Sequence, residues 1–326
     1  MASANTEKVN LREPAIMLSL LAAVAAIAAA LFMTLGVDGP WSFILPFRGA
    51  KLATLVLVAA AISISTVIFQ TATHNRILTP AIMGFDAMYV LIQTSLVFGI
   101  GMQRVVLIDP RLMFMVESVL MIGFSALLYQ LMFGSGRKSL HLLVLVGVVL
   151  GVLFRSLSNF VQRLIDPNEF TFLQDRFFAS FNNADQDLLW VSAIIILVVL
   201  AGVWRMCRTL DVLALGRETA ISLGVPYRTV IAVTLILVAV LVSVSTALVG
   251  PVTFFGLLTA HIAYALVGSG QHRHILPASV LAGIILLVGG QMVLENLFRF
   301  DTNLRVIVEF AGGIAFLFLL MRGRAK

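Results

Sequence analysis

The side chains that most often carry chemistry, those of histidine, cysteine and the acids, form no catalytic or metal-binding pattern along this chain. The histidines are scattered over different segments, and the sequence has no HExxH motif and no cysteine pair. A single cysteine, Cys207, excludes an intrachain disulfide and a cysteine-based metal site. We interpret His272 and His274, which flank Arg273, as solvated side chains of a loop. The other histidines are His74, His141 and His261.

Two short motifs of known chemistry are misplaced or missing. FGSGRK, residues 133–138, superficially resembles a serine-hydrolase motif, but it directly follows an apolar run and has the glycines of a flexible turn. A phosphate-binding loop of the form GxxxxGK followed by Ser or Thr is absent from the sequence. We therefore expect no enzyme activity, no metal site and no bound cofactor on this chain. If ATP drives its work, another polypeptide must hydrolyse that ATP.

One polar stretch, ALGRETAISLGVPYR, lies between two long apolar runs and is too polar to cross a bilayer. Gly216 can end one short turn of helix, residues 217–223 can form a second, and Gly224 can adopt the left-handed conformation that ends a helix before Pro226. The pattern predicts a pair of short helices against the inner face of a membrane. An ordinary amphipathic connector is the alternative.

The elements that must position this stretch are strongly apolar. Hydrophobic residues make up 60% of the 326 positions, charged residues 12%, and the mean hydropathy is +1.04, as is typical of polytopic membrane proteins. The apolar blocks are about 20 residues long, enough for a helix to cross ~30 Å of hydrocarbon. We predict an all-α membrane protein with about ten transmembrane helices, at about 15–35, 52–72, 81–101, 112–133, 141–162, 188–204, twice within 229–270, 277–298 and 304–321.

The run 229–270 contains no Asp, Glu, Lys or Arg, yet it is too long for one span. A single helix of that length would extend about 60 Å, twice the thickness of the hydrocarbon. The chain must therefore fold back, and VGPVTFFG, Val249–Gly256, supplies the glycine and proline for the reversal. Elsewhere, Gly147 and Gly151 have the spacing that lets two helices pack closely.

The positions of lysine and arginine favour cytoplasmic N- and C-termini. This topology gives a cytoplasmic tail at 1–14, one membrane domain at 15–321 with the inner segment 211–228, and a cytoplasmic tail at 322–326. The long connection 163–187 then lies outside and has room for short helices. The net charge of +6 suits this topology, and no basic cluster interleaved with aromatic residues indicates nucleic-acid binding.

Four stretches resemble the FecCD-type, BtuC-like permeases of ABC importers. Glu218-Thr219-Ala220 followed by Gly224 resembles the ExA-x-x-x-G pattern through which importer permeases engage their ATPase subunits. LALGRETAISLGVP is similar to the coupling segment of the family over its whole length. The other three stretches are QTATHNRILTPAIMGFDA (Gln70–Ala87), GPVTFFGLLTAHIAYALVGSGQHRHILPASVLAG (Gly250–Gly283) and FAGGIAFLFLLMRGR (Phe310–Arg324).

The resemblance implies a BtuC-like permease fold and ATP-driven import of a ferric siderophore across the bacterial cytoplasmic (inner) membrane. NRILTPAIMGFDA resembles the subgroup associated with ferric siderophores of the catecholate, anguibactin or petrobactin kind. The implied partners are a second permease subunit, identical or paralogous, two cytoplasmic ATPase subunits that use ATP and Mg, and a periplasmic or lipid-anchored siderophore-binding protein. The resemblance implies ATPase coupling for Leu215, Gly216, Arg217, Glu218, Ala220 and Gly224.

An outer RLPR sequence in the family, whose arginines dock acidic residues of the binding protein, corresponds here to Arg48-Gly49-Ala50-Lys51. The resemblance implies binding-protein docking for Arg48 and Lys51, with Lys51 acting as a point charge and not as a bidentate fork. Interfacial snorkelling of both side chains is equally open. Ala260 and Tyr264 depart from the proline and arginine of the family, and we expect His261 to be packed or beside the pore.

Ser139, Leu140 and His141 loosely resemble the inner gate of the family, and Gln70 and Asn75 are further candidates for the inner gate or pathway. Ser139 could equally be a helix cap.

A rival interpretation is an ion-coupled secondary transporter of an organic solute or metal chelate, which needs buried ionisable residues. The candidates are Asp86, Glu117, Glu295 and Glu309, and each could instead pair with a neighbouring arginine or face the outer interface. A membrane scaffold without transport activity is a third class.

Overall fold

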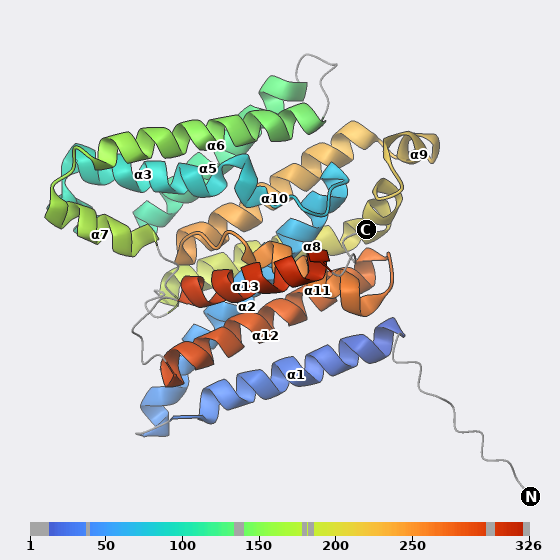
Figure 1. Ribbon diagram of the computed structural model, residues 1–326, viewed down its shortest axis with the longest axis horizontal. Helices are drawn as coiled ribbons and strands as arrows, with labels where there is room; N and C mark the ends of the chain where they lie inside the picture. Colours follow the sequence, from blue (N-terminus) through green and yellow to red (C-terminus); the bar gives the residue numbers. More distant parts are fainter. Residues whose placement is uncertain are drawn as a thin grey trace, which may run out of the picture.

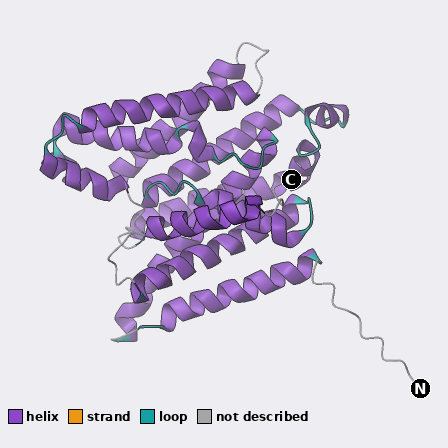
Figure 2. Cartoon of the chain, viewed as in Figure 1, coloured by secondary structure: helices purple, strands orange, loops and turns teal. Residues whose placement is uncertain are grey.

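The computed structural model describes residues 13–36, 40–133, 140–177, 181, 186–297 and 304–321, and every regular element in these ranges is helical (Figure 2). Ten of the helices follow the ten predicted apolar runs in order. They are α1 (Pro14–Thr34), α2 (Trp41–Thr73), α3 (Phe85–Ile100), α5 (Pro110–Phe133), α6 (Leu140–Gln162), α8 (Gln186–Leu213), α10 (Tyr227–Val249), α11 (Phe255–Val267), α12 (His272–Asn296) and α13 (Leu304–Met321).

Seven of these helices are long and apolar enough to cross a membrane: α1, α2, α5, α6, α8, α10 and α12. The helices α3 and α11, of 16 and 13 residues, are shorter than a full span. Large apolar side chains such as Leu153 and Val198 are exposed on the bundle, as a lipid-facing surface requires. The prediction of an all-α polytopic membrane protein is confirmed, while the number of crossings stays a prediction.

Figure 1 shows α9 (Arg217–Ser222) and α7 (Pro167–Phe177) at opposite ends of the bundle. The N-terminal end of α1 and the C-terminal end of α13 lie toward the end that carries α9 (Figure 1). We call that end the inner side and the end that carries α7 the outer side, following the predicted topology. The helix α7 confirms that the long connection contains a short helix of its own; the cytoplasmic location of the termini stays a prediction.

The helix α2 is the centre of the bundle, in contact with α8, α10, α11 and α12. From Thr54 to Thr73 only Leu57 and Val56 have partial exposure, and the other side chains are buried. Small residues of the neighbouring helices permit this packing: a Cβ on Gly256 of α11 would lie 2.1 Å from Thr66 Oγ1, and one on Gly283 of α12 would lie 2.7 Å from Ser63 Oγ. Glycine is therefore required where α11 and α12 approach α2.

The predicted reversal within 229–270 is confirmed, because α10 ends at Val249 and α11 begins at Phe255. Gly250 has φ of +95°, a conformation that residues with a Cβ rarely adopt. The packing role of Gly147 and Gly151 is confirmed as well. These residues of α6 lie against the 3₁₀ helix η1 (Pro80–Met83), and a Cβ on Gly151 would lie 3.0 Å from the Cα of Gly84.

Two helices extend well beyond the predicted apolar runs. The helix α2 begins at Trp41, eleven residues before the predicted start, and α8 continues to Leu213, nine residues past the predicted end. Charged residues bounded both predicted runs, but the helices continue through them: Lys51 of α2 contacts Glu295 of α12, and Arg205 of α8 is exposed. Further along α8, Asp211 caps the start of α12. The remaining short helix, α4 (Met102–Val106), connects α3 to α5.

Candidate functional site

The polar stretch between α8 and α10 forms one short helix, α9. The expected pair of short helices is wrong in its first member, because α8 runs without a break to Leu213 and only a turn at 214–215 separates it from Gly216. The second predicted helix, at 217–223, is confirmed with one residue fewer. The inner segment is therefore the end of α8, a turn, and α9.

Two glycines set the direction of α9. Gly216 has φ of +106° and Gly224 has φ of +81°, and a residue with a Cβ would be strained at either position. Beyond the helix, the backbone N–H of Gly224 donates to Ile221 O and that of Val225 donates to Ala220 O, both at 3.0 Å, which satisfies carbonyls at the end of α9. The predicted left-handed cap at Gly224 is confirmed, and α10 follows directly after Pro226.

One side of α9 packs on the bundle and the rest of its surface is open. Ala220 is fully buried, so its methyl group anchors the short helix and is not itself available to a partner. Exposed apolar side chains flank the charged ones, and such a mixed surface is suited to binding another protein. The exposed side chains on and beside α9 are those of Leu215, Arg217, Glu218, Thr219, Ile221, Ser222 and Leu223. The sequence-based prediction did not include Ile221 and Leu223, although apolar residues in a short polar helix are a usable signal.

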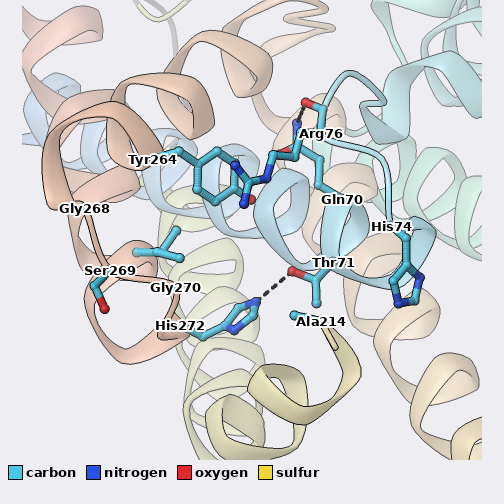
Figure 3. Close-up of a pocket in the computed structure, with 11 residues that line it drawn as sticks. Gln70, Thr71, His74, Arg76, Ala214, Tyr264, Gly268, Ser269, Gly270 and His272 are labelled. Carbon is cyan, nitrogen blue, oxygen red and sulfur yellow. Dashed lines mark hydrogen bonds between the residues drawn. The ribbon is translucent and has the colours of Figure 1, made fainter. Parts of the chain in front are cut away.

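A cavity of about 400 Å³ opens beside this segment, at the inner ends of α2, α8, α11 and α12 (Figure 3). Figure 3 shows Arg76 stacked on Tyr264, with the guanidinium carbon 4.8 Å from the ring centroid. This contact involves Tyr264, one of the positions at which the sequence departs from the family pattern. The polar side chains that line the cavity are Gln70, Thr71, His74, Arg76, Tyr264, Ser269 and His272.

His272 was expected to be solvated, and the structure contradicts this, because the residue is only 2% exposed. It is the first residue of α12 and not part of a loop. Asp211 Oδ1 of α8 accepts hydrogen bonds from the backbone N–H of His272 at 2.7 Å and from its Nδ1 at 2.6 Å. Its Nε2 lies 2.7 Å from Thr71 Oγ1 of α2, the contact dashed in Figure 3. Three helices therefore meet at one imidazole.

His74 makes a second contact between α2 and α8. It follows the last residue of α2 with φ of +51°, the only positive φ outside glycine in the described residues. From this position its Nε2 donates a hydrogen bond to Leu213 O, the last carbonyl of α8, at 2.9 Å. Helix ends leave such carbonyls without partners inside the helix, so His74 stabilises the end of α8.

The candidate gate residues are only partly described. Gln70 Nε2 donates to Arg76 O at 2.6 Å, and Asn75 Oδ1 accepts from Ile77 N at 2.9 Å, so both side chains hold the turn that follows α2. Ser139 lies outside the described residues. Leu140 and His141 begin α6, but their side chains are also outside the described part of the chain. A gate role for these five residues stays a prediction.

At the outer side, Arg48 and Lys51 of α2 face into the protein. Lys51 is 6% exposed and its ammonium forms an ion pair with Glu295 of α12. Arg48 lies 3.8 Å from the same carboxylate and donates to the carbonyl of Leu35, just past the end of α1, at 2.7 Å. These contacts identify an internal charge cluster that joins α1, α2 and α12. Docking of a binding protein by Arg48 and Lys51 stays a prediction.

The other candidate residues for ion coupling also have hydrogen-bond partners. Glu117 accepts from Gln93 Nε2 at 2.6 Å beside an outer cavity of about 650 Å³. Thr253 bridges the remaining two, because its hydroxyl donates to Asp86 at 2.9 Å and its backbone N–H donates to Glu309 at 3.3 Å. His261 is packed as expected, with Nδ1 2.8 Å from Leu257 O.

Comparison with known proteins extends over nearly the whole chain. The sequence profile described as the FecCD transport family matches residues 13–322. The chain is 48% identical over 305 residues to the petrobactin import system permease protein YclO of Bacillus subtilis strain 168, covering 94% of this chain and 96% of that protein. It is 36% identical over 291 residues to the petrobactin import system permease protein FatC of Bacillus anthracis, covering 89% and 82%.

A solved structure has the same fold. A metal-chelate type ABC transporter in an inward-facing conformation superposes with a TM-score of 0.83 at 21% identity, over 95% of this chain and 99% of that chain. At this identity the likeness concerns the fold alone. It confirms the predicted permease fold, and the profile and the two relatives confirm the family and subgroup that the motifs indicated.

Proposed function

The chain belongs to the FecCD transport family, and from this premise we propose that it is the membrane permease subunit of an ATP-driven ABC importer that carries a ferric siderophore across the cytoplasmic membrane. The observation that carries the proposal is α9: a short exposed helix, set by two glycines of positive φ, on the inner side of a multi-pass permease. Its surface of charged and apolar side chains suits a cytoplasmic ATPase.

Two copies of the permease, identical or paralogous, would enclose a common pathway, and an ATPase subunit would bind the inner segment 211–228 of each copy. ATP and Mg would be bound by the ATPases, with no cofactor on this chain. ATP binding would favour one conformation of the permease, because an ATPase pair that closes on ATP has different affinities for the two arrangements of α9. A siderophore-binding protein would deliver the chelate from outside.

The two relatives compared above are petrobactin import permeases by name, so ferric petrobactin is the cargo we propose to test first. A bulky anionic chelate needs a wide pathway with few fixed charges, because tight binding midway would prevent release. The composition supports this, since only 12% of the residues are charged. Iron would cross as part of the chelate and not as an ion bound by the permease.

The ion-coupled alternative has less support. It requires a buried ionisable group that is free to exchange an ion, whereas the four candidate acids accept hydrogen bonds or form ion pairs within the protein. The similarity to import permeases over nearly the whole chain also favours ATP coupling.

Assembly with the ATPase tests the role of α9. We would purify the permease with its ATPase and compare Glu218→Arg with Glu13→Arg, which makes the same charge change at the exposed start of α1 on the same side. Glu218→Arg is expected to remove the ATPase from the complex on size-exclusion chromatography, and Glu13→Arg to leave the complex intact. Full assembly of the Glu218→Arg variant would contradict the proposed interface.

Cargo is tested separately, by uptake of radioactive iron into vesicles that contain the permease, ATPase and binding protein. Ferric petrobactin is expected to enter, and an excess of unlabelled cobalamin is expected not to compete. Equal competition by cobalamin would contradict a siderophore permease.

A further inference from the structure

The inner end of α8 is held to two other helices by the side chains of two histidines. His272 of α12 contacts both Asp211 of α8 and Thr71 of α2, and His74 contacts Leu213 of α8. The three residues after Leu213, Ala214 to Gly216, then lead directly into α9. The contacts are thus made at the last turn of α8, just before α9, the proposed ATPase-binding helix.

The two ring nitrogens of His272 bind different helices. A carboxylate only accepts hydrogen bonds, so Nδ1 of His272 carries a proton that it donates to Asp211. The opposite nitrogen, Nε2, is then left to exchange a hydrogen bond with the hydroxyl of Thr71. Because one planar ring makes both contacts, a shift of Asp211 must be followed by Thr71 or must break a hydrogen bond. The imidazole and Thr71 are both buried, which makes a broken hydrogen bond costly.

His74 adds a contact of a different kind. Its side chain donates to the carbonyl of Leu213, and the carbonyl of Leu213 also accepts from Gly216 N at 3.1 Å. The end of α8 and the turn before α9 are therefore fixed to the residue that ends α2. Since His74 is exposed, this contact can be altered without opening the core.

The helices reached by the two histidines extend to the outer side. From Thr71 to Lys51, α2 covers about 30 Å at 1.5 Å per residue. There Lys51 pairs with Glu295, near the end of α12, so α2 and α12 are joined at both of their ends by polar contacts. A displacement of their inner ends can reach the outer side without bending either helix.

We propose that His272 and His74 are positioning residues that make the inner end of α8 move together with α2 and α12, so that movement of α9 is transmitted to the outer side. The proposal rests on the proposed function, in which an ATPase moves α9. It assigns a mechanical role to side chains on the helices next to α9, outside the ATPase-binding surface itself.

Two variants, called single-arm variants here because each keeps one of the two side-chain hydrogen bonds of His272, separate its contacts with Asp211 and Thr71. The amide of His272→Asn can occupy the position of Nδ1 and keep the contact with Asp211, but it is too short to reach Thr71. The amide of His272→Gln reaches the position of Nε2 and Thr71, and gives up the side-chain contact with Asp211, while the backbone N–H of residue 272 still donates to Asp211. His274→Asn is the matched control, because it changes a histidine of the same helix turn whose side chain contacts Ser269 in the preceding loop.

The measurement is the number of ferric petrobactin molecules taken up per ATP hydrolysed, in vesicles with the complete importer. Both single-arm variants are expected to hydrolyse ATP while this ratio falls about tenfold, within the range of allosteric coupling free energies. His274→Asn is expected to retain the wild-type ratio. A ratio within about twofold of wild type in the His272 variants would overturn the proposal.

His74→Asn tests the second contact without disturbing the core. Asparagine tolerates the left-handed backbone at this position and is too short to reach Leu213. The same loss of coupling is expected, and an unchanged ratio in His74→Asn would overturn the role assigned to His74. The proposed function fails differently, through a wild-type complex that shows no ATP-dependent uptake at all.

Discussion

Removing the ammonium of Lys51 should destabilise the permease through the charge it leaves behind. The side chain of Lys51 is 6% exposed, and its partner Glu295 is 12% exposed. In Lys51→Met the hydrocarbon stem is retained, so the variant mainly removes the charge. Glu295 then keeps only Arg48 at 3.8 Å and a hydrogen bond from Gln291 at 2.9 Å.

Breaking a buried ion pair on one side costs about 3–5 kcal/mol. The two remaining partners of Glu295 reduce this, and we expect Lys51→Met to cost about 2–3 kcal/mol. At about 2 °C per kcal/mol, the melting temperature should fall by about 4–6 °C. The double variant Lys51→Met with Glu295→Gln removes both charges together, and it should recover most of this loss, because a buried pair replaced as a whole is often nearly neutral.

The assay is thermal unfolding of the purified permease in detergent for the wild type, the two single variants and the double variant. The double-mutant cycle isolates the coupling between the two side chains. An unchanged melting temperature in Lys51→Met would refute the internal ion pair. If that variant instead weakened association with the binding protein alone, Lys51 would be a docking residue, as the family resemblance implies.

Three further predictions concern packing, exposed charge and the coupling segment. Gly256→Ala should lower the stability of the permease by about 1–3 kcal/mol, because the new Cβ would meet Thr66. Gly289→Ala is the control and should not destabilise the permease, because nothing lies within 4 Å of its new Cβ. Equal melting temperatures for the two variants would contradict the packing of α11 on α2. Arg111→Ala breaks the ion pair with Asp187, in which both side chains are more than 60% exposed, and should change the stability by less than about 1 kcal/mol in the same assay. A larger loss would contradict the expectation that an exposed ion pair contributes little to stability. Gly216→Val should leave the bundle folded and weaken ATPase binding in a pull-down, since a β-branched residue is strained at φ of +106°; undiminished binding would show that this conformation is dispensable.

Features that depend on local sequence could be predicted. The apolar runs indicated ten helices, and the uncharged run 229–270 required a reversal because a single helix would be far too long for a bilayer. The glycines around α9 indicated its limits for the same local reason, since few other residues adopt positive φ.

Features that depend on distant partners could not be predicted. Lys51 and Glu295 are 244 residues apart, and no local pattern shows that α2 passes the end of α12. The sequence neighbours of His272 are all polar, namely Gln271, Arg273 and His274, and such a stretch indicates a solvated loop. Its partner Asp211 is 61 residues earlier, so only the fold shows that His272 is buried. The predicted start of α2 was wrong for this reason, because Lys51, the charge that bounded the run, has its partner on α12. Arg205, which ended the predicted run of α8, is instead exposed, and the helix continues past it.

The most direct test of the account is the energy source for uptake by the complete importer in vesicles. Iron uptake from ferric petrobactin should stop when ATP is withheld from the side that carries α9, and it should continue when ionophores collapse the ion gradients. Uptake that persists without ATP and disappears with the ion gradient would contradict the account and identify an ion-coupled transporter.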